Sequence, residues 1–257
     1  MQQAKQKEWH DQWKMLRDNE EFLFNDWILP VTLEDMRGKT VLECGCGGGQ
    51  HTSFVAPYAL HHTAVDLNTS DLARERNKDR SNITYVEADI AKMDLQEKFD
   101  FVFSIGVVHH TDDPDKTFEN MKAHTATGGK TIVWVYSKEG NWMVEKIVEP
   151  VRKRFLRKMS RGGLLTLSRI LTFFMYLPIY TLYLLPLKFL PFYEYFQNFR
   201  KLSFYRNTLN VFDKLNAPQV LFITRERIGK WLNETDYRDV HISAYKGVSW
   251  RGSGVKK

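Results

Sequence analysis

The stretch TVLECGCGGGQHT, Thr40 to Thr52, decides the fold of this 257-residue chain. It begins as a short apolar strand, passes through a glycine loop and continues toward a helix that we expect to start near Gln50. Glycines let the backbone turn tightly and approach a ligand, and a helix N-terminus offers free N–H groups. The stretch therefore predicts a site for an anionic or nucleoside ligand.

Two acidic residues sharpen this prediction. Glu43 ends the first strand just before the glycines, and Asp66 ends the next apolar run, HHTAVD, 17 residues after Gly49. An acid at the tip of the second strand is positioned to accept hydrogen bonds from ribose hydroxyls. A P-loop is excluded because no Gly-Lys-Ser/Thr follows the glycines. A nicotinamide dehydrogenase fits less well, because its glycine motif opens without an acid two residues earlier.

Four segments in order make the chain resemble the class I S-adenosylmethionine (SAM)-dependent methyltransferases. They are VLECGCGGG from Val41, VEADI from Val86, FDFVFSIGVVHHTDDP from Phe99 and ATGGKTIVWVY from Ala126. The first is similar to the family's glycine motif and the second to its adenine-contacting segment. The third resembles the fourth strand with its loop, and the last resembles the Gly-Gly turn and fifth strand. The resemblance covers residues 38–136, with an echo at the C-terminus.

The alternation of strand and helix patterns after Gly38 predicts parallel βαβ units. Strands are expected near 40–44, 62–66, 83–87, 100–105 and 130–136, and helices at 50–59, 70–78 and 115–124. The 115–124 helix is expected to be capped by Asp112 or Asp113. A helix capped by Thr224 and two closing strands should end the chain. The expected fold class is α/β: a Rossmann-like, doubly wound, mostly parallel seven-stranded sheet with a helical insertion between the fifth and sixth strands.

We divide the chain into four parts on this basis. They are an N-terminal helical cap at 1–37, a SAM-binding Rossmann-like core at 38–137, a helical, basic and apolar insertion at 138–222, and a C-terminal helix with the last two strands at 223–257. In the cap, Trp9, Trp13 and Leu16 share one face of a helix expected over 5–29. That face either packs on the core or forms a flap over the cofactor, and periodicity does not separate the two.

The resemblance implies SAM as the cofactor and gives a role to each motif residue. The implied cofactor-binding residues are Glu43, Gly45, Cys46, Gly47, Gln50, Asp66, Leu67, Asp89, Ile90, Ser104 and Ile105. The loop amides approach the methionine part, and Glu43 orders the loop from beneath. Asp66 accepts from the ribose hydroxyls, Leu67 packs on the adenine, and Asp89 with the Ile90 N–H binds the adenine edge. The end of the fourth strand offers a carbonyl to the ammonium group. The alternative for both aspartates is a solvated acid at a strand end.

Two histidines, His109 and His110, follow SIGVV, where the family's substrate pocket begins. The methyl group of SAM is already activated, so the enzyme mainly binds it, excludes water and aligns a nucleophile. A histidine at this place is a candidate base for a hydroxyl or amine acceptor. The alternative is a histidine that orders the loop by bonding a backbone carbonyl. Tyr136 and Trp142 either line the acceptor site or are ordinary core or surface residues.

Composition bounds the partners and the compartment. The formal net charge is +6 and the pI is about 9.1, which favours an anionic partner without identifying it. Cys44 and Cys46 are the only cysteines and are badly placed to bridge, which is typical of a reducing, cytoplasmic compartment. We expect no secretory signal, because the N-terminus is polar and charged. No metal is expected, because the sequence offers no convincing set of His, Cys or carboxylate ligands apart from the adjacent His61 and His62, whose side chains should point to opposite faces of a strand.

The insertion departs from the alternating pattern. Its basic segment contains Arg152, Lys153, Arg154, Arg157, Lys158 and Arg161. An aromatic-rich run of 18 uncharged residues follows between Arg169 and Lys188. Three interpretations are open. Residues 150–200 form a lid over a lipophilic or lipid-linked acceptor and rest on an anionic membrane surface. Alternatively they span the bilayer, which Pro178 and Pro186 disfavour, or they form a buried helical subdomain of a soluble enzyme for a polar metabolite.

The sequence thus predicts a SAM-dependent methyltransferase whose acceptor is a small molecule, lipophilic or linked to a lipid or glycan, methylated at an O, N or C atom. Two alternatives remain: an RNA methyltransferase that uses the basic insertion, and a non-catalytic SAM-binding scaffold. The chain contains neither the Asp/Asn-Pro-Pro-Tyr/Phe tetrad nor the Pro-Cys pair of nucleobase methyltransferases. A nucleic-acid acceptor is therefore disfavoured and stays an alternative. The expected location is cytoplasmic, with peripheral membrane association.

Overall fold

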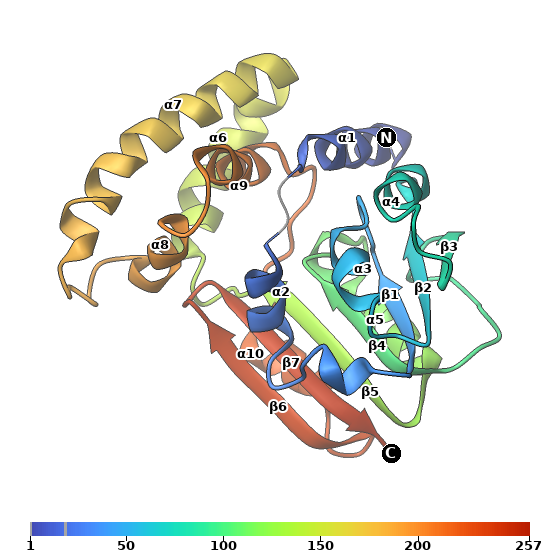
Figure 1. Cartoon of the computed structure of the whole chain (residues 1–257). Coiled ribbons are helices and arrows are strands. Elements are labelled where there is room, and N and C mark those ends of the chain that lie inside the picture. The colour runs from blue at the N-terminus through green and yellow to red at the C-terminus, as the bar shows by residue number, and fades with distance from the viewer. Residues whose placement is uncertain (1, 18–19) are drawn as a thin grey trace. The chain divides into compact units, whose positions relative to one another are not determined.

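The computed structural model describes residues 2–17 and 20–257, in which the strands form one seven-stranded sheet (Figure 1). The strands are β1 (Thr40–Cys44), β2 (His61–Asp66), β3 (Ile83–Glu87), β4 (Phe99–Ile105), β5 (Thr125–Tyr136), β6 (Tyr237–Tyr245) and β7 (Ser249–Lys256). Their order across the sheet is β3-β2-β1-β4-β5-β7-β6. Strands β1 to β5 pair in parallel, whereas β6 and β7 run in opposite directions (Figure 1). The expected α/β fold class with a mostly parallel sheet is confirmed.

Helices alternate with these strands. They are α3 (Gln50–Val55) after β1, α4 (Ser70–Arg76) after β2, α5 (Pro114–His124) after β4, and α10 (Arg225–Trp231) before β6. The Asp113 carboxylate accepts the Lys116 N–H at 3.0 Å, and the Thr224 hydroxyl accepts the Arg227 N–H at 3.1 Å. Both helices therefore begin at side-chain caps that the sequence predicts.

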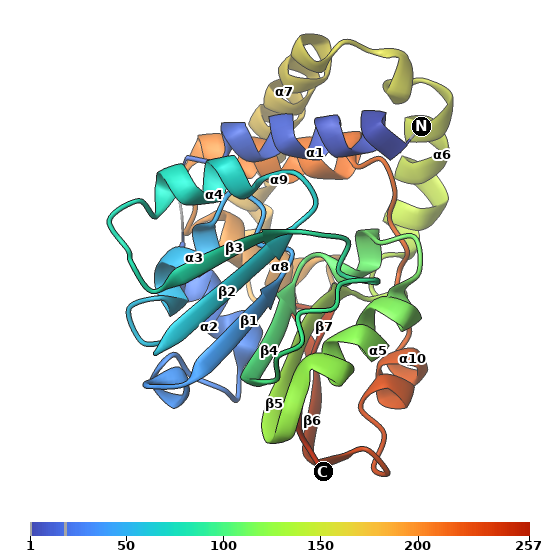
Figure 2. The same ribbon diagram turned by 90° about the vertical axis from the view of Figure 1, so that its right-hand side faces the viewer.

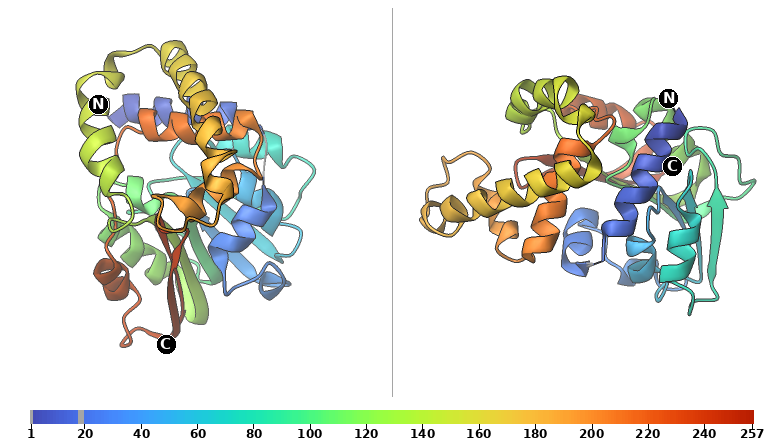
Figure 3. Two further views of the ribbon diagram at one scale, coloured as in Figure 1. Left: turned by 90° about the vertical axis from the view of Figure 1, so that its left-hand side faces the viewer. Right: turned by 90° about the horizontal axis from the view of Figure 1, so that it is seen from above.

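Two helices, not one, precede the sheet. They are α1 (Gln2–Met15) and α2 (Glu21–Ile28). The expectation of a single helix over 5–29 is wrong, because the backbone leaves the helical conformation at Leu16; residues 18–19 lie outside the described part. Figures 2 and 3 show α1 beside α4. The His10 ring nitrogen Nε2 of α1 lies 3.2 Å from the Asp71 carboxylate of α4.

Strand β5 is longer than the sequence predicts. Phe99 pairs with Thr125 while Phe101 pairs with Lys130, so the intervening residues of β5 bulge out of register. Gly128 lies in this bulge with φ +81°, a conformation that favours glycine. The expected Gly-Gly turn is thus a bulge inside the strand.

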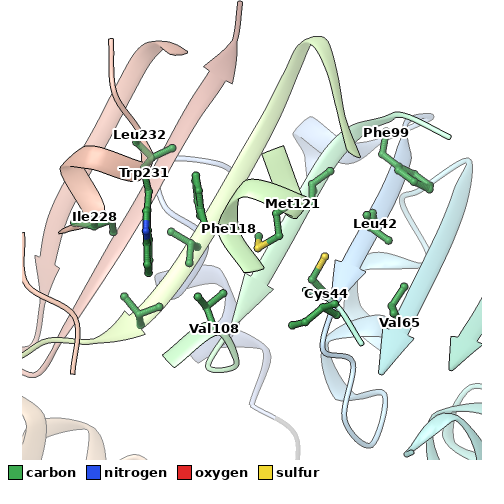
Figure 4. Close-up of a cluster of buried hydrophobic side chains, with 14 of the residues drawn as sticks. Leu42, Cys44, Val65, Phe99, Val108, Phe118, Met121, Ile228, Trp231 and Leu232 are labelled. Atoms are coloured by element: carbon green, nitrogen blue, oxygen red, sulfur yellow. The ribbon is translucent and has the colours of Figure 1, made fainter. Parts of the chain in front are cut away.

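A hydrophobic core joins the sheet to α5 and α10 (Figure 4). Leu42 and Cys44 of β1 and Val65 of β2 belong to the same buried cluster as Phe118 of α5 and Trp231 of α10. The Phe118 and Trp231 rings stack with centroids 5.2 Å apart and planes 9° apart. Burying each large apolar side chain stabilises the fold by about 1.5–3 kcal/mol. This core fixes the strands whose carboxyl ends carry the candidate site.

The chain divides into two compact units. We call Met1–Tyr136, Leu221–Ser243 and Trp250–Lys257 the sheet unit, and Ser137–Val220 with Ala244–Ser249 the insertion unit. The insertion unit contains a π-helical turn (Val144–Val148) followed by α6 (Glu149–Arg154), α7 (Arg161–Ile179), α8 (Tyr193–Phe199) and α9 (Phe204–Asn216). Short 3₁₀ turns lie at Leu156–Lys158 and Leu182–Leu184. Within this unit α7, yellow to gold in Figure 3, packs on α9.

Candidate cofactor and acceptor site

The glycine loop lies at the carboxyl ends of β1 and β2, next to the point where the strand order reverses between β1 and β4. The N–H groups of Gly45 and Cys46 donate to the Val65 carbonyl at 2.8 and 3.0 Å, which ties the loop to β2. Gly45, Gly47 and Gly49 have φ values of +89°, +51° and +75°, which explains why glycines occupy these positions. Open α/β sheets bind their ligands at such a switch point.

Asp66, at the end of β2, is hydrogen-bonded to this loop. Its Oδ2 accepts the Gly47 N–H at 2.9 Å and its Oδ1 accepts the Leu67 N–H at 2.8 Å. Burial raises the pKa of Asp66 above its ordinary value of 3.8, and these N–H donors oppose that shift. Each carboxylate oxygen retains a lone pair for a further donor. The structure therefore brings the predicted ribose acceptor to the edge of the loop.

Glu43 is the buried acid of the site, with 1% of its surface exposed. Its Oε2 accepts the Thr52 hydroxyl at 2.6 Å and lies 3.0 Å from His62 Nε2. Its Oε1 has no hydrogen-bond partner among the described residues; His51 Nδ1 lies 3.8 Å away. A buried carboxylate oxygen without a donor costs free energy. This oxygen marks a place for a donor supplied by a ligand or water.

Cys46 and Gln50, two further predicted cofactor-binding residues, make contacts within the protein itself. Cys46 is buried against Ala64 and Ala73, and burial raises the pKa of its thiol well above the ordinary value. The buried Gln50 donates from Nε2 to the Leu16 carbonyl at 3.4 Å. The Cys46 side chain is therefore a small neutral packing group, and Gln50 links the start of α3 to the segment after α1.

Arg76, the last residue of α4, and Asn77, which follows it, hold the glycine loop, and the sequence analysis did not single them out. Arg76 donates from Nε to the Gly48 carbonyl at 2.8 Å and from Nη2 to the Leu16 carbonyl at 2.7 Å. Asn77 donates from Nδ2 to the Gly49 carbonyl at 3.0 Å. Both lie at the end of an exposed, charged helix, and in sequence this helix looks like any helix with a solvated polar face. No sequence signal identifies them.

Helix α1 covers the glycine loop. A Cβ atom at Gly47 would lie 2.6 Å from the indole of Trp13. One turn earlier, the Trp9 ring lies 4.8 Å from the ring of His110. A ligand that lies against Gly47 therefore shares its space with Trp13.

The predicted adenine-edge residues lie just after β3. Asp89 accepts the Ala91 N–H on Oδ1 at 3.0 Å, and its Oδ2 lies 3.2 Å from the Lys92 ammonium. The Ile90 side chain is part of the hydrophobic core, and its carbonyl accepts from Asn120 Nδ2 at 2.8 Å. The Asp89 carboxylate thus caps a turn in this structure, and an adenine amino group would be a further donor to it.

The end of β4 lies next to the end of β1. Ser104 donates its hydroxyl to the Cys44 carbonyl at 2.7 Å, and the Ser104 and Ile105 side chains are buried. A Cβ atom at Gly45 would lie 2.5 Å from the Val107 side chain, so the loop after β4 touches the glycine loop. The structure thus brings these two predicted residues to the switch point with the glycines.

An aromatic cluster surrounds the two candidate histidines. The buried His109 ring has its centroid 4.3 Å from that of Tyr136 and 4.2 Å from that of His110. The Tyr136 N–H donates to His109 Nδ1 at 3.4 Å. The Trp134 ring of β5 lies 4.8 Å from the Trp27 ring of α2 and 5.5 Å from Tyr136. Three of the predicted acceptor-side residues are therefore together.

Trp27 and Trp134 belong to this cluster, although the sequence did not lead us to predict either of them. The buried indole Nε1 atoms of Trp27 and Trp134 have no hydrogen-bond partner in the part of the chain that the structure describes. The signal for Trp134 is its place two residues before Tyr136, on the same face of a strand; nothing local marks Trp27. Trp142 is exposed in the insertion unit.

Metal-ligating groups are not gathered at this site. Among the described residues, no group of three or more His, Cys, Asp or Glu side chains is arranged to hold a metal ion. His61 bonds the Thr84 hydroxyl at 3.0 Å, whereas His62 turns to Glu43.

Comparisons with known proteins add the following findings. A family model described as a methyltransferase domain matches residues 42–133. The chain is 31% identical over 99 residues to the ubiquinone biosynthesis O-methyltransferase of Coxiella burnetii. The aligned region covers 37% of this chain and 42% of that protein. The chain is also 28% identical over 141 residues to the tRNA U34 carboxymethyltransferase of Klebsiella pneumoniae. That aligned region covers 52% of this chain and 39% of the other protein. The chain thus spans less than half the length of these curated relatives.

A solved structure of similar fold covers nearly the whole chain. It is the magnesium protoporphyrin IX methyltransferase of Synechocystis PCC 6803 with bound SAH, with a TM-score of 0.55 and 13% identity, covering 96% of this chain and 94% of that one. At this identity the likeness concerns the fold.

Proposed function

We propose that the methyltransferase domain matched over residues 42–133 is of the class I SAM-dependent kind, and that it transfers the methyl group of SAM to a small lipophilic or lipid-linked acceptor. The observation that carries the proposal is the bond between the Asp66 carboxylate and the Gly47 N–H. It joins the Asp66 carboxylate to the glycine loop at the switch point of the sheet, and this geometry supports the binding of a nucleoside ligand there.

The residues at this edge fit SAM. Asp66 offers carboxylate lone pairs to the ribose hydroxyls, and the glycine loop admits the methionine part. Asp89 offers an acceptor to the adenine amino group. The unpaired Oε1 of Glu43 accepts a donor beneath the loop, either from the cofactor or from water. SAM, when bound, supplies a methyl group activated by a sulfonium.

A hydroxyl or amine acceptor must lose a proton when it is methylated, and we assign that proton to His110. Because the Tyr136 N–H donates to Nδ1 of His109, a neutral His109 ring carries its own proton on Nε2. It then has no lone pair left for an acceptor. His109 orders the loop, and the half-buried His110 beside it holds the proton.

The aromatic surroundings support the acceptor class. Trp27, Trp134 and Tyr136 provide ring faces that exclude water and favour an apolar molecule. The two unpaired indole N–H groups favour an acceptor that also carries an oxygen atom. A hydrophobic acceptor with a hydroxyl group, free or on a lipid-linked precursor, meets both conditions.

The test is transfer of radiolabelled methyl groups from SAM to a total lipid extract, to total RNA and to polar metabolites, each incubated separately with the purified chain. We expect label in the lipid fraction, and much less of it with the Asp66→Ala variant when SAM is kept below saturation. Label in RNA alone would favour an RNA methyltransferase, a function that the basic insertion unit also fits. SAH binding without transfer to any fraction would favour a non-catalytic scaffold.

A further inference from the structure

The outward face of α7 carries large apolar side chains. Ile170, Phe173, Phe174 and Leu177 recur at the i, i+3, i+4 and i+7 spacing that makes one stripe on a helix. Phe173 is 68% exposed, Phe174 66% and Leu177 71%. Within the described residues, α7 is the one helix with the length and composition to cross a membrane, and only 22% of its most apolar window is buried.

The buried face of α7 is smaller and more polar than its exposed face. The buried residues of α7 are Leu164, Ser168, Thr172 and Ile179, two of them hydroxyl-bearing, and α7 packs on α9. The Ser168 hydroxyl donates to the Leu164 carbonyl at 2.8 Å, and the Thr172 hydroxyl donates to the Ser168 carbonyl at 2.7 Å. A helix at a water surface has the opposite arrangement, with its apolar stripe facing the core. Small and hydroxyl-bearing residues inside, with large apolar residues outside, are typical of helices that face lipid.

The apolar exposure continues beyond the helix. Tyr180 lies just past its end, Leu184 and Leu185 are more than half exposed, and Phe189 is 81% exposed. Single exposed apolar residues are ordinary, but a long series of them marks an interaction surface. We call Ile170, Phe173, Phe174, Leu177, Leu184 and Phe189 the outer apolar surface.

Charge indicates which partner this surface fits. The insertion unit contains fifteen lysines and arginines and five acidic residues, a formal net charge of +10. Because the whole chain has +6, the sheet unit is net acidic, at −4. Arg154, Lys158, Arg169 and Lys188 are exposed, and within the described chain they form no ion pair. The unit that carries the outer apolar surface is therefore also the positively charged unit of the chain.

One residue of the basic segment does not belong to this surface. Arg152 is 3% exposed, and its guanidinium lies 3.3 Å from the Glu149 carboxylate and 3.4 Å from the Lys214 carbonyl. Arg152 is therefore buried, unlike its neighbours in the basic segment, and it links α6 to α9.

We propose that the outer apolar surface docks on an anionic phospholipid bilayer, with α7 lying in the plane of the interface. Large apolar side chains enter the headgroup boundary, and the neighbouring lysines and arginines contact the phosphates. Arg169 lies at the margin of the apolar stripe, where its long side chain reaches the headgroups. The in-plane orientation follows because α9, on which α7 packs, carries Arg206, Asp213 and Lys214, which a spanning pair would bring into hydrocarbon. This inference does not depend on methyl transfer.

The experiment is flotation of the full chain with neutral and with anionic phosphatidylserine vesicles, at low and high salt. We expect binding to anionic vesicles that weakens with salt, because screening acts beyond a Debye length of about 8 Å at physiological salt. Replacing Arg154, Lys158, Arg169 and Lys188 with Gln should weaken anionic binding by at least about tenfold. The control variant replaces Lys39, Arg80, Lys116 and Arg238 with Gln, which removes an equal number of exposed lysines and arginines from the sheet unit. This control should bind anionic vesicles as well as the wild type does. SAH affinity should be unchanged in both variants.

A second variant tests the apolar part. Phe173→Gln with Phe174→Gln and Leu177→Gln should abolish flotation without loss of folding, because all three side chains are exposed. In Phe173→Trp, the added fluorescence should be quenched more by lipids brominated near the headgroup than by lipids brominated near the bilayer centre. Quenching mainly by the deep lipids would overturn the in-plane orientation.

Two results would overturn the proposal as a whole. One is wild-type protein that never floats with anionic vesicles. The other is self-association that the triple glutamine variant removes, in a wild type that ignores lipid, because the surface would then be an interface between two copies of this chain.

Discussion

The Asp66 carboxylate accepts the Gly47 N–H at 2.9 Å, so the tip of β2 and the glycine loop form one connected edge. The same carboxylate accepts the Leu67 N–H, which leaves it oriented along the loop. This geometry makes the protonation state of Asp66 decisive for the ligand, because a protonated carboxyl loses acceptor capacity.

The first prediction concerns pH. Burial raises the pKa of Asp66 above 3.8, so protonation begins at a higher pH in the folded chain than in the unfolded chain. SAH affinity should therefore fall as pH decreases through this raised pKa. Calorimetry as a function of pH measures it, with Asp66→Asn as the comparison, since the amide does not titrate. The same acid-side loss in Asp66→Asn would assign the titration to another group.

The second prediction concerns Trp13. Because its indole lies against Gly47, SAH binding should move this ring and change tryptophan fluorescence. Most of the change should disappear in Trp13→Phe, while Trp250→Phe, on β7, serves as the control. A signal of unchanged size in Trp13→Phe would mean that the ligand does not reach the glycine loop from the side of α1.

The third prediction concerns the pair that joins α5 to α10. Arg227 donates to both oxygens of Asp115, at 2.8 and 2.9 Å, and Trp231 donates to Oδ1 at 2.6 Å. The hydrogen bond from Arg227 lowers the pKa of Asp115. A carboxyl with a depressed folded pKa contributes stability above its unfolded value of about 3.9, and this is lost as pH falls through the folded value.

Asp115→Asn should accordingly reduce the free energy of unfolding at pH 7. The expected loss is up to about 1 kcal/mol, because this ion pair is largely exposed. Thermal unfolding at pH 7 and at pH 3 tests it, with the exposed Asp79→Asn as the control. A loss as large at pH 3 as at pH 7 would contradict the linkage.

The fourth prediction separates the two histidines. If His110 takes the acceptor's proton, His110→Asn should lower kcat about a hundredfold or more and remove the acid limb of the pH–rate profile. His109→Asn should lower kcat less and keep that limb, because His109 orders the loop through the Tyr136 N–H. An acid limb that survives in His110→Asn would remove this histidine from the mechanism.

The sheet unit follows closely from local sequence patterns. Strands β1, β2 and β4 are short apolar runs, and the Asp113 and Thr224 caps lie within three residues of the N–H groups that they accept. The glycine positions were predictable because positive φ angles at Gly45, Gly47 and Gly49 exclude most other residues.

Contacts between distant segments were not predictable. Arg76 binds the carbonyl of Leu16, 60 residues earlier, and Trp27 meets Trp134 across more than a hundred residues. Such pairs depend on how helices pack on the sheet, which periodicity does not encode. Burial of Arg152 is a similar case, since its neighbours in sequence are exposed cations and its partner carbonyl belongs to Lys214.

The measurement that tests the central proposal most directly is calorimetric titration of the purified chain with SAH, in wild type, Asp66→Ala and the exposed control Asp79→Ala. We expect the wild type and the control to bind equally. Asp66→Ala should bind more weakly by about 1–3 kcal/mol, because the ribose hydroxyls lose their acceptor. Wild type that does not bind SAH, or equal affinity in Asp66→Ala, would contradict a cofactor site built on Asp66 and the glycine loop.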